Sequence, residues 1–117
     1  NVVLSETMDD LVKRNGITYK KFSDVPFSGK VTGLHQGTIK NGFEEGVWVR
    51  YHQNGQLFYK GNFKNVKTDG SWVSYRKNGQ LSSKGNWKNN KREGVWVDYN
   101  KDGTIDKILT GTYKKWI

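Results

Sequence analysis

The chain contains no cysteine, a single proline and only two histidines among its 117 residues. Without cysteine it can form neither a disulfide framework nor a catalytic thiolate. The His-Glu-x-x-His zinc motif and the Gly-x-Ser-x-Gly nucleophile motif are also missing. No hydrophobic run approaches the ~20 residues that a membrane-spanning helix needs. We therefore expect no enzyme active site, no metal, no cofactor and no membrane span.

Aliphatic side chains are scarce too, since hydrophobic residues make up 33% of the chain. Five tryptophans, six tyrosines and five phenylalanines carry much of the apolar surface, and such large rings can fill a thin core. The length suits one domain, residues 1–117. The formal net charge of +9 favours acidic partners, namely nucleic acid, an anionic membrane surface or an acidic protein. A basic surface also serves solubility alone.

What the chain has in abundance is repetition. The pattern Gly-x-Trp-x-x-Tyr, followed by an Asn-Gly or Asp-Gly pair, begins at Gly46, Gly70 and Gly94, so that the offset between successive copies is constant. A fixed period of this length is the signature of a repeat architecture. Because Asn-Gly between apolar segments is a strong hairpin signal, the repeating unit is predicted to be a β-hairpin and the fold class all-β.

The period also divides the chain into units. Residues 37–40 lie one period before 61–64, so a shortened first repeat is expected to cap the array. The last unit is slightly longer than the others, since 111–114 follows 85–88 by more than one period. The predicted units are an N-terminal extension at 1–25, a degenerate capping repeat at 26–40, full repeats at 41–64, 65–88 and 89–114, and a C-terminal end at 115–117.

The N-terminal extension allows two interpretations. Thr7 could cap a short helix with Asp9 and Asp10 in its first turn. Alternatively, residues 11–14 and 17–20 flank Asn15-Gly16 as the two strands of a tight hairpin. The hairpin is favoured, because Asn-Gly turns recur in the rest of the chain.

Within one repeat, a two-residue type I′ turn at Asn54-Gly55 would fix the strand register. Counting outward from it places Trp48 opposite Gly61, and the same count places Trp72 opposite Gly85. An aromatic ring that covers a cross-strand glycine stabilises a sheet, so each tryptophan is predicted to lie over the glycine of its own hairpin.

Alternation along the strands then divides the side chains between two faces. We call them the tryptophan face, which holds Trp48, Trp72 and Trp96, and the lysine face, which holds Lys60 and Lys84. The tryptophan face carries more large apolar groups and is predicted to be the core. The same count adds Leu57, Phe63, Leu81, Trp87, Ile105 and Tyr113 to the tryptophan face, and Val49, Tyr51, Val73, Tyr75, Val97 and Tyr99 to the lysine face.

Charges across the strands predict three ion pairs, Glu45 with Lys64, Asp69 with Lys88 and Asp98 with Lys107. Lys60 and Lys84 have no such partner. They would stand beside a ladder of tyrosines. The stacking of identical repeats explains such a ladder as readily as a role in binding does. The candidate binding face comprises Tyr51, Tyr75, Tyr99, Lys60, Lys84, Asn62 and Asn86.

The pattern Gly-x-Trp-x-x-Tyr-x-x-Asn-Gly-Gln-Leu, followed by Gly-Asn-aromatic-Lys, resembles the bacterial type of MORN repeat over roughly residues 26–114. The resemblance implies an elongated, curled single antiparallel sheet of consecutive hairpins and a non-enzymatic module. Eukaryotic relatives are associated with membrane junctions, phosphoinositide kinases and protein scaffolds. Bacterial relatives are often exported or labelled as antitoxin components.

The function expected from these features is non-catalytic binding or scaffolding of a protein partner through the tyrosine and lysine ladder. Anionic-lipid binding at a membrane surface and antitoxin-like neutralisation of a partner protein are the alternatives, and nucleic acid ranks last. Residues 11–29 also look like the segment that precedes such repeats in exported members. The chain opens at Asn1 rather than Met, so it is either a trimmed chain or a mature product from which a signal has been removed. With the resemblance to exported members, export to the periplasm or cell exterior is favoured over a cytoplasmic location.

Overall fold

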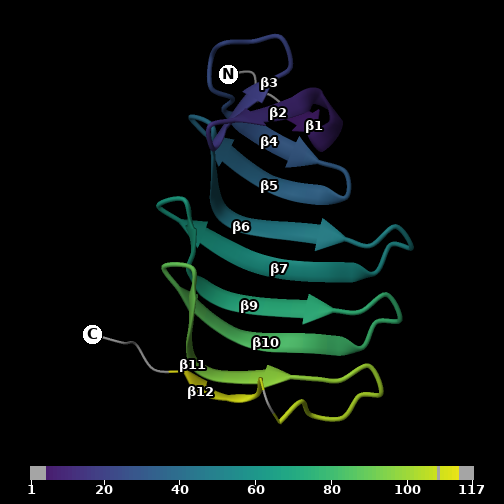
Figure 1. Cartoon of the computed structure of the whole chain (residues 1–117). Coiled ribbons are helices and arrows are strands. Elements are labelled where there is room, and N and C mark those ends of the chain that lie inside the picture. The colour runs from purple at the N-terminus through teal and green to yellow at the C-terminus, as the bar shows by residue number, and fades with distance from the viewer. Residues whose placement is uncertain (1–4, 108, 114–117) are drawn as a thin grey trace.

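The computed structural model describes residues 5–107 and 109–113, which form an all-β fold of stacked hairpins (Figure 1). Nearly every described segment is a strand or a tight turn, as the repeat pattern predicts. The elements are β1 (Ser5–Thr7), the 3-10 helix η1 (Met8–Asp10), β2 (Leu11–Arg14), β3 (Ile17–Lys20), β4 (Gly29–Thr32), β5 (His35–Lys40), β6 (Phe43–Tyr51), β7 (Leu57–Lys64), β8 (Lys67–Thr68), β9 (Gly70–Tyr75), β10 (Leu81–Lys88), β11 (Lys91–Asp98) and β12 (Gly111–Tyr113).

One curled sheet contains all the strands except β2 and β3. Its strand order is β1-β4-β5-β6-β7-β9-β10-β11-β12, with β8 paired to β7 as well. Neighbours are antiparallel apart from β1 and β4, which run parallel. The strands follow one another along the sheet in chain order from β4 onward, and their loops gather along two opposite edges (Figure 1). The predicted antiparallel sheet of consecutive hairpins is therefore confirmed.

The N-terminal extension forms the favoured hairpin. β2 and β3 pair antiparallel around Asn15 and Gly16, whose φ angles of 51° and 79° are those of a type I′ turn. The segment preceding this hairpin makes a single 3-10 turn, η1, and the Thr7 side chain does not cap it. The helical alternative for residues 8–21 is thereby excluded.

The loops inside the repeats differ from the predicted type I′ turn. The amide of His52 donates to the carbonyl of Gln56 at 2.8 Å, and the amide of Gly55 donates to the carbonyl of His52 at 2.9 Å. This pattern is a three-residue loop, in which Gly55 (φ 89°) takes the left-handed conformation and Asn54 does not. The Asn54 side chain instead accepts a bond from the amide of Gln56 at 3.0 Å.

The predicted register survives because two departures from it cancel. The longer loop pairs Tyr51 with Leu57 instead of Phe58, and a bulge beside Arg50 then restores the original count. Trp48 consequently stands opposite Gly61, as predicted. The second repeat behaves in the same way, with Trp72 opposite Gly85.

Type I′ turns do occur, but at the opposite edge, where one repeat passes to the next. The positive φ pairs are Asn41 with Gly42, Asn65 with Val66, and Asn89 with Asn90. Each follows the last residue of one strand and precedes the next strand. The sequence prediction missed all three turns. Asn65-Val66 and Asn89-Asn90 lack the glycine that normally marks such a turn, whereas Asn41-Gly42 carries it.

A row of alternating tryptophans and glycines, the Trp–Gly row, runs across the sheet. Trp48, Trp72 and Trp96 stand opposite Gly61, Gly85 and Gly111, respectively. The rings, however, lie on the glycine of the preceding repeat, so that Trp48 covers Gly37, Trp72 covers Gly61 and Trp96 covers Gly85. A Cβ atom on any of these three glycines would lie far inside van der Waals contact with the ring.

The prediction that each ring covers the glycine of its own hairpin is therefore wrong. The strand register shifts between Gln36 and Thr38 and again between Lys84 and Asn86, next to the covered glycines. A backbone carbonyl beside each shift accepts an indole N–H bond, Thr38 from Trp48 at 3.1 Å and Asn86 from Trp96 at 2.8 Å. These bonds hold the rings towards the preceding strand.

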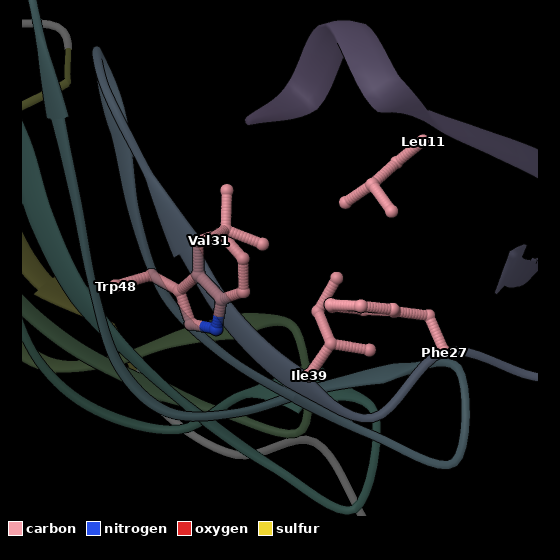
Figure 2. Close-up of a cluster of buried hydrophobic side chains, with 5 residues drawn as sticks. All are labelled: Leu11, Phe27, Val31, Ile39 and Trp48. Atoms are coloured by element: carbon pink, nitrogen blue, oxygen red, sulfur yellow. The ribbon is translucent and has the colours of Figure 1, made fainter. Parts of the chain in front are cut away.

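The tryptophan face is the buried face, as predicted. At its N-terminal end the β2–β3 hairpin and Phe27 cover Val31, Ile39 and Trp48 (Figure 2). Further along, rings cover one another: Tyr59 stacks on Trp72 with centroids 4.8 Å apart, and Trp87 meets Trp72 and Trp96 edge to face. Trp96 is fully buried.

At the C-terminal end the core is closed by Arg92 and Asp98. The guanidinium makes two hydrogen bonds to the Asp98 carboxylate, at 2.6 and 2.9 Å, and lies 4.0 Å from the centre of the Trp96 ring. The hydrogen bonds to Asp98 raise the pKa of Arg92 above its ordinary value, so the guanidinium stays charged beside the carboxylate.

This pairing also corrects the predicted ion pairs. Asp98 is bound by Arg92, not by Lys107. Neither of the pairs predicted for Glu45 with Lys64 and Asp69 with Lys88 occurs among the ion pairs of residues 5–107 and 109–113. The strand register places Lys64 opposite Lys67 and Lys88 opposite Lys91. Exposed side chains also gain little from pairing in water.

Replacing Gly85 by alanine should lower the free energy of unfolding by about 2 kcal/mol, because the added methyl group displaces the Trp96 ring from its place in a packed core. Urea denaturation of the wild type and the variant measures the change. Asn86→Ala, on the adjacent exposed position, is the control and should have little effect. Equal stability of Gly85→Ala and the wild type would contradict the ring contact.

Asp98→Asn should lower the unfolding free energy by about 2–3 kcal/mol, because it leaves the partly buried guanidinium of Arg92 without its counter-charge. Asp69→Asn removes the same charge from a carboxylate that forms no ion pair in the described chain, and should change stability by less than about 0.5 kcal/mol. Thermal unfolding followed by circular dichroism compares the two. Similar losses in both variants would rule out a specific role for the pair.

Candidate functional site

The lysine face carries a groove of about 640 Å³ that crosses the strands from β6 to β11. Lys60, Asn62, Lys84 and Asn86 line it, four of the seven residues of the predicted binding face. Valines from β6, β9 and β11 supply the apolar part of its lining. Two glycines and one tryptophan of the Trp–Gly row also belong to the lining, so the row that holds the core borders the groove as well.

Strand register explains why these side chains gather. Lys60 stands opposite Val49 on one side and Val73 on the other, and Lys84 stands opposite Val73 and Val97. Valines and lysines therefore alternate, one on each strand, across five neighbouring strands. Because the pattern recurs every second strand, the two ammonium groups are separated by one valine-bearing strand.

The polar groups of the groove have no partners within the part of the chain that the structure describes. The side chains of Lys60, Lys84, Asn62, Asn86 and Ser71 form no hydrogen bond or ion pair there. No carboxylate belongs to the lining, and Glu93, which stands opposite Asn86, lies outside it. The groove therefore presents only free donors and amides around an apolar strip.

Polar groups of the tryptophan face are arranged differently. Ser74 and Ser83 are buried and bond to each other at 2.6 Å, and the indole of Trp72 donates to Ser83 at 3.3 Å. Arg92 and Asp98 satisfy each other. These buried groups satisfy one another, whereas the lysine, asparagine and serine side chains of the groove are free to bind a ligand.

The three tyrosines of the predicted binding face do not line the groove. Tyr51, Tyr75 and Tyr99 are half-buried and lie nearer the three-residue loops. They stand opposite Leu57, Leu81 and Ile105, respectively. The sequence count places these aliphatic residues on the tryptophan face, and the longer loop is what moves them to the tyrosine side.

Each tyrosine also marks a link between repeats. The imidazole of His52 donates through Nε2 to the carbonyl of Tyr75 at 2.9 Å, and the guanidinium of Arg76 donates to the carbonyl of Tyr99 at 2.7 Å. The residue that follows the tyrosine in one repeat thus binds the tyrosine backbone of the next. This part of the predicted ladder holds neighbouring repeats together.

Sequence reasoning missed the valines at the middle position of Gly-x-Trp. Val47 and Val95 line the groove with exposed fractions of 54% and 66%, and Ser71 occupies the equivalent position in the second repeat. The signal was present, because a residue next to a buried tryptophan on a strand must face the other way.

Residues 5–107 and 109–113 contain no group of three or more histidines, aspartates or glutamates that could hold a metal ion. Within the same residues, no helix has the length and apolarity to cross a membrane.

Comparison with known proteins identifies the repeat. The sequence model of the family described as MORN repeat variant matches residues 44–65 and 68–89. These two segments contain most of the strands β6, β7, β9 and β10, which form the middle of the sheet. Repeats of this family generally serve non-catalytic binding or scaffolding. No curated protein matches the chain, and no solved structure matches it.

Proposed function

We propose that this chain, a protein that contains MORN repeats of the variant type, is a binding module whose groove on the lysine face holds an extended acidic segment of a partner protein. The observation that carries the proposal is the groove itself, in which two ammonium groups and two amides have no partner in the described chain and no carboxylate is present. Such a surface is complementary to carboxylates on an extended chain.

The spacing of the repeats supports one particular shape for this segment. Lys60 and Lys84 lie two strands apart, a separation of roughly 9.6 Å. In a β-strand partner, two residues that are three positions apart would point to opposite sides, because side chains alternate along a strand. A polyproline II segment has three residues per turn and advances about 9.3 Å in that turn. Acidic residues at every third position of such a segment would therefore reach successive lysines.

The apolar strip supports the same partner. Between the lysines, Val73 lies in the middle of the groove, with Val47 and Val97 towards its two ends. Small apolar residues or prolines between the acidic ones would contact these valines, as proline-rich segments commonly do with apolar grooves. The groove spans four strand spacings, roughly 19 Å, which corresponds to about six residues of a polyproline II segment.

A peptide with three repeats of Glu-Pro-Pro should bind the wild-type chain, and Lys60→Glu/Lys84→Glu should weaken the binding at least about tenfold, because both cations that meet the carboxylates are reversed. Isothermal titration calorimetry measures the affinity. The matched control is Lys67→Glu/Lys91→Glu, which makes the same charge change at two exposed positions that are also one repeat apart but lie outside the groove. It should retain most of the affinity.

A second peptide of the same composition, with its three glutamates adjacent, separates spacing from charge and should bind more weakly. Equal binding of the two peptides, or equal losses in the two double variants, would refute the groove as the site. Binding of phosphatidylserine vesicles by a chain that does not bind the peptide would favour a membrane surface and contradict the proposal.

A further inference from the structure

A second hollow, of about 610 Å³, lies at the loop edge of the sheet and shares no lining residue with the groove. It is bounded by η1, by the turn between β4 and β5, by the loop between β6 and β7, and by Lys77 from the loop between β9 and β10. Its volume is within the range of small-molecule sites in proteins. Four separate segments of the chain thus meet around one space.

Basic side chains gather in this hollow. Both histidines of the chain, His35 and His52, line it together with Arg50 and Lys77. Neither Arg50 nor Lys77 forms an ion pair in the part of the chain that the structure describes. Asp9 is the one carboxylate of the lining, so the two permanent cations outnumber it. The net excess of one positive charge favours an anionic ligand.

An aromatic wall stands beside these cations. His52 stacks on Phe58 with centroids 4.4 Å apart and an interplanar angle of 18°. The guanidinium of Arg50 lies over the same phenylalanine, 5.2 Å from the ring centre. Because Nε2 of His52 donates to the carbonyl of Tyr75, the imidazole is fixed in orientation by the next repeat. Cations and a planar wall are therefore held in a defined arrangement before any ligand arrives.

The rest of the lining contains polar residues such as Thr7, Thr32 and Gln53 together with two exposed apolar side chains. Met8 and Leu34 keep 44% and 42% of their surface exposed, although both belong to the lining. A purely inorganic anion would leave these side chains in water. A ligand with a flat apolar body would cover them and gain from doing so.

We propose that this hollow is a binding site for a small phosphate monoester carried on an aromatic ring, with Arg50 and Lys77 holding the phosphate and Phe58, Leu34 and Met8 contacting the ring. Phosphate fits because its three oxygens can accept from a planar guanidinium and an ammonium together, and its second charge matches the second cation. The site is independent of the peptide groove, since different residues form it.

Titration of the full chain with phenyl phosphate and with inorganic phosphate tests the site. Phenyl phosphate should bind at least about tenfold more tightly, a difference that one buried ring face can supply. Arg50→Gln and Lys77→Gln should each weaken phenyl phosphate by about tenfold or more. Lys101→Gln is the matched control, since Lys101 occupies the equivalent position one repeat later and lies outside this hollow. It should bind phenyl phosphate as the wild type does.

The pKa of His35 provides a local measure of binding at this site. His35 stands opposite Arg50, and burial, followed by the charge of Arg50, lowers its pKa. The other titratable or charged groups of the hollow are Asp9, Tyr51, His52 and Lys77. A bound phosphate beside Arg50 should raise the pKa of His35, because its negative charge favours the protonated imidazole.

The titration of the His35 imidazole is followed by nuclear magnetic resonance with and without phenyl phosphate. An upward shift of its pKa together with loss of affinity in Arg50→Gln supports the site. No binding of phenyl phosphate at millimolar concentration, an unmoved His35, equal affinity for inorganic phosphate, or an equal loss in Lys101→Gln would each overturn the proposal.

Discussion

The contact between a tryptophan ring and the glycine of the preceding repeat determines the rest of the structure. The ring occupies space that a Cβ atom would fill, so the glycine is required wherever a ring arrives. Because the contact crosses from one hairpin to the previous one, no repeat completes its own core. Trp48 depends on Gly37 of the capping hairpin, and Trp96 depends on Gly85. Stability in such an array comes from the interfaces between neighbours, as in other repeat proteins. The two ends are closed by different means, the β2–β3 hairpin at one and the Arg92–Asp98 pair at the other.

The period of the sequence predicted much of this fold, because a constant offset between copies fixes which residues are equivalent. The period could not predict the loops. Asn54-Gly55 indicates a two-residue turn, yet the Asn54 side chain stabilises a longer loop by accepting a hydrogen bond from the amide of Gln56. The register of Trp48 was nevertheless correct, because the bulge beside Arg50 compensates for the extra loop residue. The register did not predict which way the Trp48 ring points. That direction is set by a hydrogen bond to the carbonyl of Thr38, which lies beside the bulge between Gln36 and Thr38. Unit boundaries stay a prediction.

The residues of the lysine face could be predicted from the sequence, but their ion pairs could not. Alternation from Trp48 and Trp72 places Lys60, Lys84 and their asparagine neighbours on one side without knowledge of the fold. Alternation along a strand does not predict which residues a long, charged side chain forms an ion pair with. Lys64 and Lys88 stand opposite other lysines and form no ion pair in the described chain. Asp98 pairs with Arg92 on its own strand, because an aromatic ring holds the guanidinium beside it. Pairing in this protein follows burial more than cross-strand position.

Equivalent positions on the tryptophan face also show how location in the array changes chemistry. Arg50, Ser74 and Asp98 follow one another at intervals of one repeat. In the middle of the sheet the position is covered on both sides, and Ser74 is small, buried and bonded to Ser83. At the last repeat Asp98 forms an ion pair with Arg92.

At the first repeat the preceding strands β4 and β5 are joined by a short turn, at Gly33 and Leu34. Strand β6 is longer and runs on to Tyr51 and into a three-residue loop. The short hairpin leaves the space beside Arg50 unfilled, and a charged side chain can stand there because water or a ligand reaches it. The hollow is thus a consequence of the shortened first hairpin, and a full repeat in its place would close it.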